Sequence, residues 1–201
     1  VRIGSIGAPG KHIMKPLRLT MQAFGPYADR VELDFRPALE SGLFGIYGPT
    51  GSGKSSIFSA MTFALFGESA REDQMATSLR SDHADPDCLT QVELIFGLGA
   101  KTYLCRRVPD QVRPAKRGGG ETRENHSAWL FDVTGIPVAE ISASHCGVVL
   151  AEKKVTLVDE VLSRILGYGA DQFRQIVLLP QGKFETFLTA KTDKRLAILR
   201  D

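Results

Sequence analysis

A glycine-rich stretch between residues 48 and 55 constrains this chain more than any other part of its sequence. It consists of Gly48-Pro49-Thr50-Gly51-Ser52-Gly53-Lys54-Ser55 and fits the pattern G-x-x-x-x-G-K-S/T at every fixed position. Glycines allow backbone conformations that aim successive N–H groups inward and let a phosphate approach without a Cβ clash. A helix that begins near Lys54 adds the partial positive charge of its N-terminus. The stretch therefore predicts a loop that binds nucleotide phosphates.

The residues on either side of this loop support the same interpretation. Leu43-Phe44-Gly45-Ile46-Tyr47 is short, apolar and uncharged, which is typical of a strand buried on both faces. After the loop, apolar residues recur at helical spacing until Gly67 ends the run. In this context Lys54 is expected to reach the β- and γ-phosphates, and the Ser55 hydroxyl is expected to bind Mg²⁺. We therefore expect a nucleoside triphosphate and Mg²⁺ as ligands.

The rest of the sequence predicts an α/β fold. Alternating apolar residues indicate strands before the loop and a hairpin after it, and a short apolar strand is expected at Ile176–Leu179. The hairpin strands form a β-rich insertion at about residues 90–141, between the two halves of an α/β core. We expect strands near residues 17–23, 31–35, 92–96, 102–108 and 128–133.

Composition excludes several classes of protein. The chain has 43% hydrophobic residues and nearly balanced charges, 25 basic against 23 acidic, so it is not intrinsically disordered. Its longest apolar stretch is too short to span a membrane, for which about 18 residues are needed. Three cysteines without paired spacing suit a reducing compartment, and we expect a cytoplasmic location. Residues 1–13 show no signal peptide and are expected to be a disordered or cloning-derived extension.

Two further stretches are ambiguous when only their residues are considered. Val155–Glu160 is apolar and ends in Asp159 and Glu160, as a metal-binding strand would, but helical periodicity continues through it to Leu166 and favours a helix. Gln181 follows the predicted strand at Ile176–Leu179, where its amide could contact a metal ion and an attacking water. Taken alone, Pro180-Gln181-Gly182 favours a plain turn.

Several stretches together resemble the N-terminal half of the ATPase head in the SbcC family of SMC-like DNA-repair ATPases. The similarity extends over nearly the whole chain from Met14 onward. This chain differs from many relatives at Gly25-Pro26-Tyr27, where they carry an Arg or a Ser-His pair near the nucleotide. The matching stretches are residues 15–20, Phe24-Gly25-Pro26-Tyr27, the loop from Gly48 to Ser56, Phe63-Ala64-Leu65-Phe66-Gly67-Glu68, Leu79-Arg80-Ser81-Asp82, and residues 172–182.

The resemblance implies a P-loop NTPase fold of the ABC-ATPase type, with residues 14–191 forming the N-terminal lobe of a head. It implies that ATP and Mg²⁺ bind residues 48–56, Ser56 included, and that Gln181 ligates Mg²⁺ and senses the γ-phosphate. Residues 192–201 would begin a coiled coil. The C-terminal half of the head would supply the signature serine, the acidic metal ligand and the general base. The chain alone is therefore expected to bind ATP without hydrolysing it efficiently.

The resemblance also implies partners. Two heads would close over two nucleotides and gate an SbcD-type nuclease on double-stranded DNA ends. Residues 101–123 carry seven basic side chains against two acidic ones, and such a cluster suits either a DNA backbone or a solvated hairpin end. The candidate DNA contacts are Arg106, Arg107, Arg113, Lys116 and Arg117.

Two other classes of P-loop protein compete with this assignment. A nucleotide kinase has a similar length and a similar loop, but its loop usually follows the first strand, whereas two predicted strands precede it here. A nucleotide-binding component of an ABC transporter would need its own signature motif and a glutamine much closer to Lys54 than Gln181 is.

Overall fold

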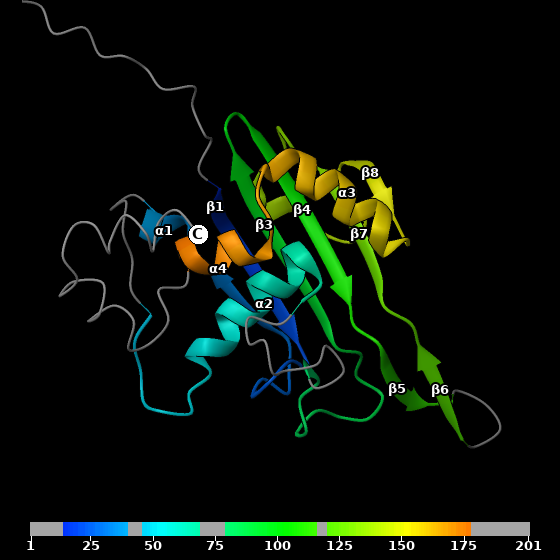
Figure 1. The fold of residues 1–201 in the computed structure, drawn as a ribbon. Coiled ribbons are helices and arrows are strands. Elements are labelled where there is room, and N and C mark those ends of the chain that lie inside the picture. Colours follow the sequence, from blue (N-terminus) through cyan, green and yellow to red (C-terminus); the bar gives the residue numbers. More distant parts are fainter. Residues whose placement is uncertain (1–13, 40–45, 69–78, 116–119, 178–201) are drawn as a thin grey trace, which may run out of the picture.

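An antiparallel sheet forms the centre of the structure. The computed structural model describes residues 14–39, 46–68, 79–115 and 120–177, and within them six strands pair in the order β2, β1, β3, β4, β7, β8. Figure 1 shows this sheet with helices packed across one of its faces. The strands are β1 Lys15–Gln22, β2 Val31–Asp34, β3 Gln91–Leu98, β4 Lys101–Val108, β7 Ser127–Asp132 and β8 Val148–Glu152.

Helices α2 (Lys54–Phe66), α3 (Val155–Leu166) and α4 (Ala170–Val177) cover this face. Side chains that alternate along the strands point toward them, because successive residues of a strand face opposite sides of a sheet. Phe173 of α4 packs on Phe66 of α2, with ring centroids 5.4 Å apart. The main core contains, among others, Leu19, Met21, Phe63, Leu65, Leu94, Phe96, Cys105, Leu130, Val158 and Leu162.

The opposite face of the sheet carries a smaller apolar cluster and a group of ion pairs. Ile95, Leu104 and Phe131 pack with Val133 and Ile141, which lie beside the short 3-10 helix η2 (Val138–Glu140). Leu17 also joins this cluster because a β-bulge between Pro16 and Arg18 breaks the alternation of β1.

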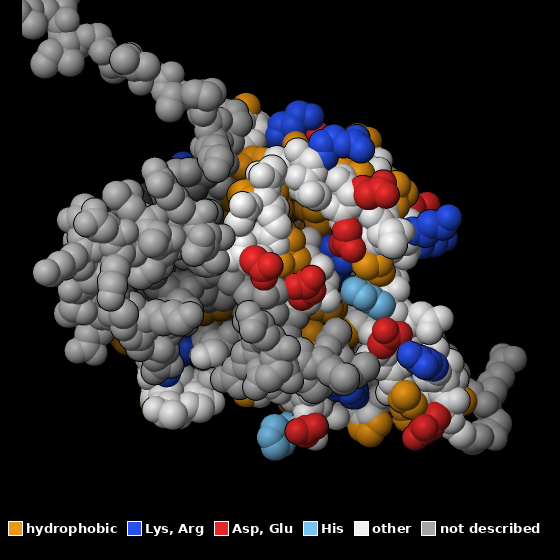
Figure 2. Space-filling model, in the orientation of Figure 1, with side chains coloured by type: hydrophobic (Ala, Val, Ile, Leu, Met, Phe, Trp, Pro, Cys, Tyr) orange, Lys and Arg blue, Asp and Glu red, His pale blue; other side chains and the backbone are white. Residues whose placement is uncertain are grey.

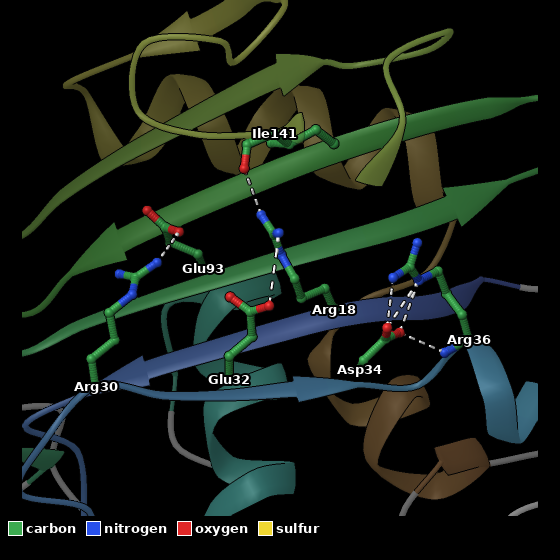
Figure 3. Close-up of polar contacts among 7 residues, drawn as sticks. All are labelled: Arg18, Arg30, Glu32, Asp34, Arg36, Glu93 and Ile141. Atoms are coloured by element: carbon green, nitrogen blue, oxygen red, sulfur yellow. Dashed lines mark hydrogen bonds and ion pairs between the residues drawn. The ribbon is translucent and has the colours of Figure 1, made fainter. Parts of the chain in front are cut away.

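Charged side chains surround that second cluster and neutralise one another. Figure 3 shows Arg18 between Glu32 and the carbonyl of Ile141, and Arg30 beside Glu93. Asp34 accepts two hydrogen bonds from Nε of Arg36 and one from Nη2, and these bonds lower the pKa of the Asp34 carboxyl. The short helix α1 (Arg36–Leu39) follows directly.

Strands β5 (Gln111–Pro114) and β6 (Glu121–Glu124) pair only with each other in the described part of the chain. They form a ribbon that extends past the end of the main sheet (Figure 1). The predicted insertion at about residues 90–141 is therefore divided in the structure. Its strands β3, β4 and β7 belong to the main sheet, and β5 and β6 form the separate ribbon.

The expected strands before the loop, the hairpin of β3 and β4, and the helix over residues 155–166 are confirmed. The prediction of a strand at Ile176–Leu179 is wrong for Ile176 and Val177, which lie in α4. Phe173, Ile176 and Val177 have the i, i+3, i+4 spacing of a helix, and this spacing outweighs the short apolar run.

The predicted strand over residues 43–47 lies partly outside the described residues. Its last two positions, Ile46 and Tyr47, are not in a strand, and Tyr47 is 95% exposed. Gln181, Lys116 and Arg117 also lie outside the described residues, as do residues 1–13 and 192–201. Among the described helices, none has both the length and the apolar character needed to cross a bilayer.

Candidate nucleotide-binding site

The glycine-rich stretch forms a loop that leads directly into α2. Gly53 is the N-cap residue of this helix, with φ of 86°, and Gly51 has φ of 85°. Both values lie in the left-handed region, where a residue with a Cβ is strained. A Cβ at Gly51 would contact no atom of the described residues within 4 Å, so the space beside Gly51 is open. The backbone thus leaves space where a phosphate could approach.

Several amides at the mouth of the helix are available to an anion. Those of Gly51, Gly53 and Lys54 make no hydrogen bond to any described residue, as expected for the first turn of a helix. The Lys54 ammonium lies beside them and donates to the carbonyl oxygens of Gly48 and Pro49, both at 2.7 Å. A cation and unpaired N–H groups are the donors that nucleotide phosphates require. The residues present therefore fit a triphosphate, with Ser55 adjacent for Mg²⁺.

A tight turn supports the loop from its outer side. Phe24 and Tyr27 exchange two backbone hydrogen bonds of 2.8 and 2.9 Å, which close the turn. The Tyr27 hydroxyl donates to the Gly53 carbonyl at 3.3 Å. Partial burial against the loop raises the pKa of Tyr27, so its hydroxyl stays protonated and can donate. Residues 24–27 therefore contact the backbone of the loop in this structure.

A second segment fixes that turn in place. Gly25 donates to the Leu79 carbonyl and Ser81 donates to the Ala23 carbonyl, both at 2.9 Å. The Arg80 guanidinium binds backbone carbonyls of residues 85–88, which orders the segment that leads to β3. Three of the stretches that carry the family resemblance, residues 24–27, 48–56 and 79–82, thus lie together around one loop. Their separation in the sequence gave no indication of this contact.

Arg107, one of the candidate DNA contacts, is buried in the core at the C-terminal end of α2. Its side chain is fully buried and donates to the carbonyls of Ala64 and Leu65, at 2.8 and 3.0 Å, and to the carboxylate of Asp159 in α3. These carbonyls are at the end of α2, where helices leave such groups unpaired. The expectation that Arg107 contacts DNA does not fit this position, because strand alternation directs its side chain toward the helices.

Other polar groups pack around Arg107. His126 stacks on Phe63 with ring centroids 5.5 Å apart, and burial, followed by the charge of Arg107, lowers its pKa. The Cys105 thiol donates to the Ala64 carbonyl, and burial raises its pKa to about 11. The imidazole is therefore held neutral and the thiol protonated. Both groups help to anchor the end of α2 to the sheet.

The remaining candidate DNA contacts in the described residues are paired with acids. Arg106 donates to Glu93 at 2.7 Å on the face away from α2, and Arg113 donates to Glu124 at 3.2 Å across the ribbon. On the face seen in Figure 2, both acidic and basic side chains lie on the side of the molecule that carries α3 and the ribbon. The excess of basic residues in 101–123 is therefore partly neutralised by acids that lie elsewhere in the sequence.

Gly51 and Gly53 both have left-handed backbone angles, but the space around them differs. A Cβ at Gly53 would lie 2.6 Å from the Tyr27 hydroxyl oxygen and 2.9 Å from Cγ of Pro26, whereas a Cβ at Gly51 meets open space. We expect Gly51→Ala to lower the free energy of unfolding by about 1 kcal/mol, from backbone strain alone. Gly53→Ala should cost about 2 to 3 kcal/mol, because a steric clash adds to the same strain. Urea denaturation of both variants measures the difference, and equal losses would contradict the described packing.

A glycine loop with unpaired amides and a lysine at the start of a helix defines the class of P-loop nucleotide-binding proteins. The sequence profile described as AAA domain matches residues 18–201. The chain belongs to this AAA domain family.

Curated relatives are similar along almost the whole chain. The SbcC component of the SbcCD nuclease from Vibrio cholerae is 40% identical over 182 residues, which is 90% of this chain. The proteins of the same name from Lactococcus lactis and Staphylococcus aureus are 40% and 36% identical over 187 residues, or 93% of the chain. The chain spans 17% of the length of each of these relatives. All three relatives are named as parts of a nuclease, and none of the three as a nucleotide kinase or a transporter.

Proposed function

We propose that this chain is the ATP-binding half of an SMC-like DNA-repair ATPase that gates a nuclease. The observation that carries the proposal is the loop from Gly48 to Lys54. The amides of Gly51, Gly53 and Lys54, which have no hydrogen-bond partner in the part of the chain that the structure describes, lie there beside the Lys54 ammonium at the N-terminus of α2. The similarity to the SbcC component of the SbcCD nuclease supports the DNA-repair context.

Different residues of the loop would hold the phosphates and the Mg²⁺ ion of the nucleotide. The amides of Gly51, Gly53 and Lys54 would bind the phosphates, and Lys54 would exchange the carbonyls of Gly48 and Pro49 for phosphate oxygens. Ser55 and Gln181 would hold Mg²⁺, which when bound neutralises charge on the β- and γ-phosphates, and Ser56 would belong to the nucleotide-binding residues. Gln181 would also sense the γ-phosphate.

Hydrolysis would need groups that the proposal assigns to the C-terminal half of the head. Glu160 and Asp159 lie on helix α3, and Asp159 is engaged with Arg107 at the far end of α2 from the loop. The acids of α3 are therefore not placed beside Lys54. We propose that the chain binds ATP but turns it over poorly until the second half and a second head complete the site.

The nucleotide would act by bringing two heads together. ATP would hold two heads together because its γ-phosphate contacts both heads, and hydrolysis would release them. This cycle would control an SbcD-type nuclease on double-stranded DNA ends.

The test of this function is titration of the chain with ATP and Mg²⁺ in a calorimeter, followed by a phosphotransfer assay with nucleoside monophosphates. Saturable binding of ATP without phosphotransfer supports the proposal. Transfer of a phosphoryl group to a monophosphate would instead identify a kinase.

The proposed DNA contact makes a separate prediction about salt. Lys116 and Arg117 are the candidates outside the described residues, and each phosphate contact contributes about one unit to the slope of log affinity against log salt. In the full-length protein, replacing both with alanine should therefore reduce that slope by roughly two. Arg106→Gln is the matched control, because Arg106 is paired with Glu93 on the sheet. If the slope of log affinity against log salt falls in Arg106→Gln but not in the variant with alanine at both 116 and 117, the assignment of Lys116 and Arg117 as DNA contacts is refuted.

A further inference from the structure

The Tyr27 side chain lies against the outer surface of the phosphate loop. Its hydroxyl oxygen is 3.3 Å from the carbonyl oxygen of Gly53 and 3.5 Å from that of Ser52. The ring is so close that a Cβ added to Gly53 would lie 2.8 Å from Cζ of the tyrosine. Gly53 is thus the position at which the loop backbone and this aromatic ring meet.

The direction of these carbonyls decides the direction of the neighbouring amides. In a planar trans peptide the C=O and the following N–H point in opposite directions. The hydroxyl has one hydrogen to donate, and it faces the Gly53 carbonyl at 3.3 Å and the Ser52 carbonyl at 3.5 Å on the outer side of the loop. The amides of Gly53 and Lys54, which follow these carbonyls, therefore point toward the inside of the loop. Those two amides have no partner among the described residues.

The tyrosine is itself held by a rigid element. Its backbone exchanges two hydrogen bonds with Phe24, and the Phe24 side chain is 1% exposed and packs on Phe63 of α2. Gly25 of the same turn lies close to Ser56, since a Cβ added at Gly25 would be 3.2 Å from Oγ of Ser56. The turn therefore contacts both the loop and the helix that follows it.

We infer that Tyr27 is a positioning residue for nucleotide binding, and that its hydroxyl preorganises the amides of Gly53 and Lys54 for phosphate. The inference rests on the proposed ATP-binding function and deepens it. The Gly53 carbonyl also accepts from the amides of Ser56 and Ile57 in the first turn of α2. The hydroxyl is thus one of several restraints, and its removal should weaken binding without abolishing it.

The experiment compares Tyr27→Phe with wild type in the full-length protein. Without the hydroxyl, the cost of orienting these amides falls on the binding step, and a cost equal to that of one neutral hydrogen bond should raise the Kd for both ATP and ADP by about five-fold, measured by calorimetry with Mg²⁺. The same factor is expected for both because the affected amides do not depend on the γ-phosphate. Tyr168→Phe is the matched control, because Tyr168 is a partly buried tyrosine beside Phe173, away from the loop.

A second measurement separates positioning from a structural role. The melting temperature of Tyr27→Phe without nucleotide should fall by only a few degrees, because one hydrogen bond of the free protein is lost, and its increase on adding ATP should also be smaller than in wild type. An unchanged Kd, or an ATP-induced increase equal to that of wild type, overturns the inference while the proposed function stands. Absence of ATP binding by the wild-type protein overturns both.

Discussion

Replacing Lys54 with alanine is expected to weaken ATP binding by about 100-fold or more, because charge-assisted hydrogen bonds to phosphate are among the strongest in proteins. The Lys54 ammonium already lies at the mouth of the loop, 2.7 Å from the carbonyl oxygens of Gly48 and Pro49. Phosphate oxygens would replace these neutral acceptors with charged ones. Titration calorimetry with ATP and Mg²⁺ measures the loss.

Two variants control this experiment. Lys101→Ala removes an exposed lysine that pairs with Asp132 on the hairpin, so ATP affinity should not change. Lys54→Arg keeps the charge but not the compact shape of the ammonium. Its affinity for ATP should therefore lie between those of wild type and Lys54→Ala. An affinity for ATP that is the same in Lys54→Ala and wild type would refute the assignment of the loop as a nucleotide site.

Replacing Arg107 with alanine is expected to lower the free energy of unfolding by about 3 to 5 kcal/mol. The side chain is fully buried, and its removal takes the guanidinium donor from the Leu65 carbonyl, leaves the Ala64 carbonyl with the Cys105 thiol, and opens a cavity beside α2. For a chain of this size the melting temperature should fall by roughly 10 °C. Thermal and urea denaturation, monitored by circular dichroism, measure both quantities.

The neighbouring Arg106 provides a matched control on the same strand. Its side chain is 20% exposed and pairs with Glu93 on the other face of the sheet, so Arg106→Ala should cost about 1 kcal/mol or less. A similar loss in both variants would show that Arg107 does not occupy the buried position described. Salt should also weaken the Arg106 pair more than the contacts of Arg107.

The local patterns of the sequence predicted much of the fold. Alternation of apolar residues identified β1, β2 and β3, and the hairpin turn after β3 identified β4. A further apolar stretch identified β7. The helix α3 could be separated from an acidic strand because Val158, Leu162 and Leu166 recur on one side of it, and all three are buried. The loop and the start of α2 followed from the motif itself.

Contacts between distant segments could not be predicted in the same way. Alternation places Arg107 on the same face as Tyr103 and Cys105, but a basic residue at that position gives no local sign that Ala64, Leu65 and Asp159 will satisfy it. The ion pair of Arg113 and Glu124 could not be predicted either, because it depends on the register of β5 and β6. For the same reason, the sequence suggested a separate insertion where the structure continues one sheet.

The order of the strands has a consequence for how the site forms during synthesis. Strand β1 pairs with β3, and the turn after β1 binds the Leu79 carbonyl, so both depend on residues that follow the phosphate loop in the chain. The ribosome releases the loop before these residues, and the loop therefore lacks its supporting turn at that stage. Such non-local pairing slows folding. A nascent chain should acquire the competence to bind nucleotide only after β3 has emerged.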